Sequence, residues 1–246
     1  MRILKIIAAL FFINTVFPGF IHGQQAADTS IAMQQQKNAL TLYYNALDIQ
    51  SGLYNGSEYI VYVSLLKDGH PYLDTAQLTT GSVFYDGLLY QNVPMLYDIV
   101  KDELIVQHFN KVFYVQLVQS KVENFNILGR KFIHLGKDSI QKGNIKNGFY
   151  ELLYDGQIKL YARRTKTIQE FIPDMQVERR VFAANRYFIY KDNVFNEVFN
   201  QASVLKILAD KKAGLTQALR KQHIKFRKQK ETAMKLMLHQ YENANP

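Results

Sequence analysis

Residues 150–162 read YELLYDGQIKLYA, two apolar and aromatic runs joined by Asp155-Gly156. An Asp-Gly pair between such runs is a strong signal for a β-hairpin, because both residues accept the positive φ angles of a tight turn. The pattern recurs around Asp86-Gly87 and around Lys191-Asp192-Asn193. The chain is therefore expected to form successive antiparallel hairpins.

Further strands are predicted between these hairpins. Runs dense in β-branched and aromatic residues, which favour extended backbone, occupy residues 58–66, 104–106, 112–117 and 131–135. The first run is expected to end at the turn Lys67-Asp68-Gly69. Pro94 indicates a sheet edge or a bulge, because proline cannot donate to a neighbouring strand. The sequence thus predicts an antiparallel β-meander, either curved or partly closed.

The period of the apolar residues changes near Ser203, from the two-residue repeat of strands towards the 3.6-residue repeat of helices. Ser203 is suited to cap a helix over residues 204–208, Ala213-Gly214 is expected to interrupt it, and residues 215–222 restart it. A last amphipathic helix is predicted over residues 228–241. The fold class is therefore α+β: the meander, followed by two or three C-terminal helices.

The first residues have the pattern of a secretory signal peptide. Arg2 and Lys5 form a short cationic region, and the apolar run 6–17 is too short to span a bilayer. Cleavage is expected after Gly23. The predicted organisation is a signal peptide at 1–23, a polar mobile entry segment at 24–50, a β-rich domain at 51–202, and a basic helical tail at 203–246 packed on the sheet.

Composition restricts where and how such a chain acts. We expect export to the periplasm or the cell surface, with no transmembrane helix in the mature chain. The sequence has no cysteine, which excludes disulfides, thiolate metal sites, cysteine nucleophiles and the acylated cysteine of a lipoprotein anchor. A chain of this length is expected to be held by its own core.

Basic residues concentrate in the tail. Residues 24–202 carry equal numbers of acidic and basic side chains, whereas residues 203–242 carry ten basic and three acidic ones. Such a tail can dock on an acidic protein or make peripheral contact with an anionic membrane, and export disfavours nucleic acid. The alternative is that its apolar positions pack on the sheet while the lysines face water. The candidate interaction surface is Lys221, Lys225, Arg227, Lys228 and Lys230.

Local signatures of catalysis and of cofactor binding are absent from the sequence. It has no nucleophile elbow, no zinc-protease motif, no phosphate-cradling loop and no dinucleotide-binding turn. A hydrolase with a dispersed site would require His70 or His134 to meet a carboxylate. The cluster of Asp98, Asp102 and Glu103 is interpreted as solvated turn charges. No catalytic residue, cofactor or metal is therefore predicted.

Two arginine doublets, Arg163-Arg164 and Arg179-Arg180, are interpreted as solvated faces near strand ends.

Several segments resemble uncharacterised exported proteins of Bacteroidota. The resemblance extends over residues 50–242 and is carried by LYNG at 53–56, GHPY at 69–72, GSVFYDG at 81–87, NVPMLYD at 92–98, LYDG at 153–156 and VLKILADKK at 204–212. It implies a Gram-negative cell envelope as the setting. It implies no activity, and therefore no catalytic residues.

These observations favour a non-enzymatic exported envelope protein that binds a protein partner. The alternative is a periplasmic carrier that holds a lipid or another apolar ligand on a curved aromatic sheet. The carrier needs an uncovered sheet face, lined by Tyr59, Val61 and Val63 or by the residues that alternate with them.

Overall fold

The computed structural model describes residues 51–136, 139, 143 and 145–243, together with Gln35, Asn38 and Ala39. The predicted signal peptide and its cleavage site lie outside the described residues. So does the predicted mobile entry segment, apart from those three residues, which are helical. Residues 50–246 form one compact unit, to which the fold below belongs.

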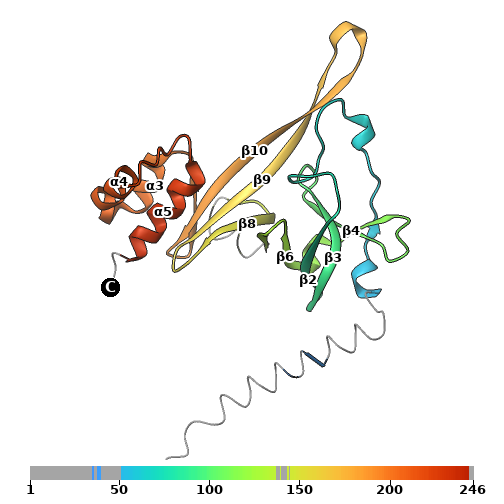
Figure 1. Cartoon of the computed structure of the whole chain (residues 1–246), viewed down its shortest axis with the longest axis horizontal. Helices are drawn as coiled ribbons and strands as arrows, with labels where there is room; N and C mark the ends of the chain where they lie inside the picture. Colours follow the sequence, from blue (N-terminus) through green and yellow to red (C-terminus); the bar gives the residue numbers. More distant parts are fainter. Residues whose placement is uncertain are drawn as a thin grey trace, which may run out of the picture. The chain divides into compact units, whose positions relative to one another are not determined.

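An antiparallel sheet dominates this unit (Figure 1). Its described strands are β1 (Ser57–Glu58), β2 (Thr79–Tyr85), β3 (Leu88–Asp98), β4 (Glu103–Gln107), β5 (Tyr114–Gln116), β6 (Val122–Ile127), β7 (Arg130–Leu135), β8 (Gly148–Asp155), β9 (Lys159–Phe171), β10 (Glu178–Lys191) and β11 (Val194–Val198). The strand order is β1-β5-β4-β3-β2-β6-β7-β8-β9-β10-β11. The sheet is open, with β1 and β11 at its two ends.

The three predicted hairpins are confirmed. They join β2 to β3, β8 to β9 and β10 to β11. Asp86 and Gly87 have φ angles of 51° and 80°, the left-handed conformation that such turns require. A further tight turn, Leu128-Gly129, joins β6 to β7 and was not identified from the sequence.

The meander consists of two parts. Strands β2 to β5 form the first and β6 to β11 the second, and β6 pairs with β2. Pro94 lies opposite Thr80 on β2, at a point where pairing with β4 has not yet begun. The register between β2 and β3 shifts between Gly81 and Val83. The predicted edge or bulge at Pro94 is confirmed.

The prediction of a strand over residues 58–66 is wrong. Only β1 is a paired strand there, and Val63–Leu65 form a short 3-10 helix. The hydroxyls of Tyr59 and Tyr62 both donate to Asp98 Oδ2, at 2.8 and 2.7 Å. Side chains three residues apart therefore share one side of the chain, which the two-residue alternation of a strand does not allow.

Three helices follow the sheet: α3 (Gln201–Ile207), α4 (Lys212–Lys221) and α5 (Lys230–Asn243). The cap of α3 is Asn200, whose Oδ1 accepts from Ser203 N at 2.9 Å, while Ser203 Oγ accepts from Asn200 N at 3.1 Å. The predicted N-cap at Ser203 is therefore wrong: the helix begins three residues earlier, after Asn200. A 3-10 turn at Ala209–Lys211 separates α3 from α4, and Gly214 lies within α4.

The helices pack against one face of the sheet, over parts of β8 to β11. A single apolar cluster contains Leu160 and Ile189 from the sheet and Leu215, Met234 and Met237 from the helices, all at most 1% exposed. A second cluster, beside it on the same face, includes Phe132 and Phe149. Among the described residues, no helix is both long and apolar enough to cross a bilayer.

Candidate functional site

A row of charged side chains separates the two apolar clusters. Arg130 on β7, Glu151 on β8 and Arg164 on β9 lie on the same sheet face as Phe132, Phe149 and Ala162, because paired residues and alternate residues share a face. Glu151 is 6% exposed and Arg164 is 9% exposed. Charged groups this buried need close partners.

Each of these groups has ion-pair partners. Glu151 accepts from Arg130 Nε and Nη2 at 2.8 and 2.6 Å, and from Arg164 Nε at 2.7 Å. Arg130 Nη1 also donates to Asp74 at 2.6 Å. Arg164 Nη1 donates to Glu231 of α5 at 2.7 Å, and Tyr187 donates to the same oxygen at 2.8 Å. The row therefore ties the helical tail to the sheet.

A cleft of about 580 Å³ opens over this row. Nine residues line it: Leu73, Asp74, Ile99, Arg130, Glu151, Arg164, Lys166, Ala183 and Glu231. Six of the nine are charged, so the cleft suits polar or charged groups, not an apolar ligand.

Lys166 differs from the other cations of the cleft. Its Nζ donates to the backbone carbonyls of His70 and Tyr72 at 2.9 and 2.5 Å. No carboxylate of the described residues lies within ion-pair distance of it. Burial lowers the pKa of Lys166, against the opposing effects of Asp74 and Asp98. A cation held this way favours an added anion.

Lys166 lies directly opposite Ala183, in the β9–β10 hairpin that borders the cleft. β10 pairs with β9 along nearly its whole length, but β11 covers only Tyr187–Lys191. Near the other end, Asp68 forms a bridge with Arg180. Residues 182–186 are all exposed, and on the side away from β9 they have no strand partner among the described residues.

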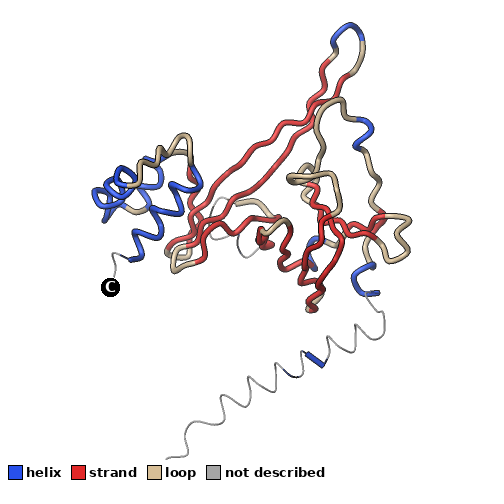
Figure 2. Tube along the Cα trace, viewed as in Figure 1, coloured by secondary structure: helices blue, strands red, loops and turns tan. Residues whose placement is uncertain are grey.

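The outer end of this hairpin carries exposed apolar side chains, and Figure 2 shows its two strands and their connecting turn. We call residues 171–177 the tip. Ile172 is 71% exposed, Met175 is 97% exposed and Val177 is also exposed. Asp174 and Met175 have φ angles of 50° and 63°, a left-handed conformation that costs non-glycine residues energy. Strain combined with apolar exposure points to a function for the tip.

Asp98 and Asp102 have structural partners and Glu103 is partly buried, so the interpretation of these carboxylates as solvated turn charges is wrong. Asp98 is fully buried and accepts from the backbone N–H groups of Val100 and Lys101 as well as from the two tyrosines described above. Glu103 lies half-buried, and burial raises its pKa.

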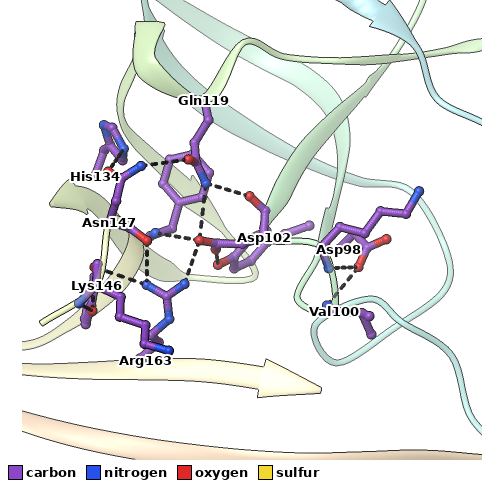
Figure 3. A network of polar contacts seen from close by, with 12 residues as sticks. Asp98, Val100, Asp102, Gln119, His134, Lys146, Asn147 and Arg163 are labelled. Atoms are coloured by element: carbon purple, nitrogen blue, oxygen red, sulfur yellow. Dashed lines mark hydrogen bonds and ion pairs between the residues drawn. The ribbon is translucent and has the colours of Figure 1, made fainter. Parts of the chain in front are cut away.

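Asp102 is the centre of a second network (Figure 3). Its carboxylate accepts from Tyr97 Oη at 2.5 Å, Arg163 Nη2 at 3.0 Å and Gln119 Nε2 at 3.2 Å. Gly148 has a φ of 142°, a conformation that other residues rarely adopt, and it lets this carboxylate approach the backbone closely. Asp102 therefore joins the β3–β4 turn to β8 and β9.

The pairing that a dispersed hydrolase would need is not formed by the described residues. His134 Nε2 lies 3.0 Å from Asn147 Oδ1, an amide (Figure 3). The Nδ1 atom of His70 is buried without a hydrogen-bond partner. Among the described side chains, no group of three or more His, Asp or Glu residues could hold a metal ion.

The basic surface inferred from the sequence lies around the α4–α5 connection. Lys221, Lys225, Arg227 and Lys228 are exposed, and Lys230 is half-buried with its Nζ 4.7 Å from the centre of the Tyr187 ring. None of the five forms an ion pair with another described residue. Of the five, Lys230 adjoins the cleft, because Tyr187 beneath it donates to the cleft residue Glu231.

Sequence reasoning missed the charged row. Arg163 and Arg164 lie in the middle of β9 with carboxylate partners, so their interpretation as solvated faces is wrong. The available signal was their position: two arginines inside a run that continues β-like to Phe171. Glu231, one of three acidic residues in a basic tail, was the other indication.

The residues proposed for an apolar carrier do not line a sheet face. Tyr59 is buried against Asp98, Val61 lies in a loop and is exposed, and Val63 belongs to the 3-10 helix.

Comparisons with protein-family models, curated proteins and solved structures found no match to this chain.

Proposed function

We propose that this chain is an exported, non-enzymatic envelope protein that binds a protein partner through the β9–β10 hairpin. The observation that carries the proposal is the tip: Ile172 is 71% exposed and Met175 is 97% exposed, at the end of two long paired strands. Burying two such side chains in a partner removes apolar surface from water, which is the main driving force of protein association.

The charges around the tip favour a protein over an anionic membrane. Asp174 belongs to the tip itself, and Glu170 and Glu178 flank it. Glu170 pairs with Arg179, and Glu178 pairs with Lys67 and Arg180. An interface with an apolar centre and a rim of paired charges is typical of protein recognition. An uncompensated Asp174 would be repelled by anionic lipid headgroups.

The polar lining of the cleft also favours binding of a protein partner over carriage of an apolar ligand. A carrier for lipids would need an apolar cavity, whereas six charged residues line the cleft over the charged row. We therefore propose partner binding in preference to the carrier.

The proposal is tested by tagging the chain in its native envelope and quantifying co-purified proteins by mass spectrometry. Three chains are compared: wild type, the tip variant Ile172→Asp/Met175→Asp, and the control variant Val112→Asp/Phe199→Asp. The control residues are also apolar and exposed, at 81% and 67%, but lie elsewhere. We expect one protein to be lost only from the tip variant. Equal recovery from all three chains would contradict the proposal.

A further inference from the structure

The proposed partner has a second place to bind on the same hairpin. We propose that residues 182–186 of β10 accept an extended segment of the partner, which adds to the sheet as one more strand and places an acidic side chain against Lys166. This inference rests on the proposed function, and it names the mode of binding and the chemistry of the segment.

The backbone N–H and C=O groups of β10 are oriented so that another strand can pair with them. Arg179 C=O accepts from Lys67 N at 2.9 Å, on the side away from β9. Alternate residues of an antiparallel strand direct their N–H and C=O groups to the same side. Ala183 and Asn185 therefore direct both groups outward, where no described residue pairs with them.

This edge lacks the usual protection against pairing. Natural sheets guard their edges with lysine, proline, bulges or covering loops. Here the exposed edge contains Ala183 and Ala184, whose small side chains leave the backbone accessible, and the β9–β10 register shows no bulge. Arg186 is the charged residue within this exposed part of β10, and its guanidinium is held by Glu197 of β11 at 2.7 Å.

The open edge has a defined length. The bridge at Asp68 ends it near Arg180, and β11 ends it at Tyr187. Five residues of extended chain span about 16 Å. The site therefore fits one short segment, which would continue the sheet between two existing backbone partners.

The cleft supplies selectivity for an acidic side chain. Ala183 and Lys166 form a cross-strand pair and both line the cleft, so they lie on the same face. A residue of the added strand opposite Ala183 projects to this face as well. Lys166 lacks a carboxylate partner, whereas Arg130 and Arg164 are already paired with Glu151. A glutamate or aspartate at that position of the segment would provide the missing partner.

The test uses a phage-displayed library of random heptapeptides, selected on the immobilised full chain. We expect enrichment of peptides that alternate β-branched residues and carry an acidic residue near the centre. Ala183→Pro removes the outward N–H at an edge position where proline is tolerated. We expect this variant to bind the enriched peptides at least tenfold more weakly than wild type. Ala183→Ser keeps the N–H and is expected to bind within about twofold of wild type. Lys166→Gln is expected to lower the affinity about tenfold, and only for peptides that carry the acidic residue.

A second measurement covers the case in which Ala183→Pro disturbs the fold. In the wild-type chain, an enriched peptide should slow hydrogen exchange at the amides of Ala183 and Asn185. No enrichment, equal affinity for Ala183→Pro and Ala183→Ser, or unchanged exchange at these amides would each overturn strand addition. The tip variant Ile172→Asp/Met175→Asp should still bind the peptides, so failure here is distinct from failure of the proposed function.

Discussion

Arg164 on β9 and Glu231 on α5 form an ion pair of 2.7 Å, and the same guanidinium binds Glu151 on β8. One side chain thus connects the helical tail to the sheet at the floor of the cleft. The arginine is held on two sides by carboxylates, so the row is rigid without any ligand.

The first prediction concerns Glu151, the central anion of the row. Glu151→Gln leaves Arg130 and Arg164 without their shared carboxylate in a buried position. We expect the free energy of unfolding to fall by about 3 kcal/mol, as for other buried pairs that lose one partner. Urea unfolding measures this change. The control is Asp155→Asn on the same strand, which removes an exposed pair with Lys159 and should cost less than about 1 kcal/mol. Equal losses would contradict a buried role for the row.

The second prediction is a pH dependence set by Glu231. Burial alone would raise the pKa of Glu231, but the hydrogen bonds from Arg164 and Tyr187 outweigh it and lower the pKa below its ordinary value. A carboxylate with a lowered folded-state pKa adds stability above its unfolded pKa, and that stability is lost as the pH falls through the folded value. We expect urea midpoints to decline as the pH falls below about 4.3, and to decline less steeply in Glu231→Gln. Parallel declines in the two proteins would show that Glu231 is not the group responsible.

The third prediction separates strain from packing at the tip. Met175 has a φ of 63° and is 97% exposed, so glycine would relieve the strained backbone without leaving a cavity. We expect Met175→Gly to raise the free energy of unfolding by about 1 kcal/mol while partner binding weakens. Val177→Gly is the matched control, because Val177 is exposed but lacks a positive φ, and glycine there should be neutral or destabilising. A gain of stability together with full partner binding would show that the strained backbone at Met175 is not needed for partner binding.

The fourth prediction distinguishes the two faces of the tail. Met237 is fully buried between α5 and the sheet, and Met237→Ala should cost about 3 kcal/mol. Replacing exposed Lys221, Lys225, Arg227 or Lys228 singly by glutamine should change stability by less than about 0.5 kcal/mol. Thermal unfolding of the five variants measures both effects. A large loss from any lysine or arginine variant would contradict the exposed position of that side chain.

Local signals predicted a large part of this fold. Asp86-Gly87 and Asp192-Asn193 form turns where the sequence places them, because Asp, Asn and Gly adopt the required positive φ angles at low cost. Asp155-Gly156 also begins a turn where predicted, between β8 and β9, but neither residue has a positive φ. The α+β class and the helical tail follow from the change in apolar period near Ser203. The pairing of β6 with β2 could not be predicted, because it joins strands that lie far apart in the chain.

The candidate site was harder to predict than the fold. Residues 58–66 have strong β propensity, but two tyrosine hydroxyls converging on Asp98 impose a non-extended backbone. The charged row is assembled from β7, β8, β9 and α5, so no short motif marks it. The open edge at Ala183 depends on where β11 ends its pairing with β10, which is a property of the register and not of composition.

The most direct test of the central claim is photo-crosslinking at the tip in the native envelope. A photoreactive amino acid is placed at position 175, at control position 112, or at position 175 in an Ile172→Asp background. We predict one discrete protein adduct from position 175, absent from position 112 and lost with Ile172→Asp. The absence of an adduct, the same adducts from both positions, or an adduct with a second copy of this chain alone would contradict partner binding through the hairpin.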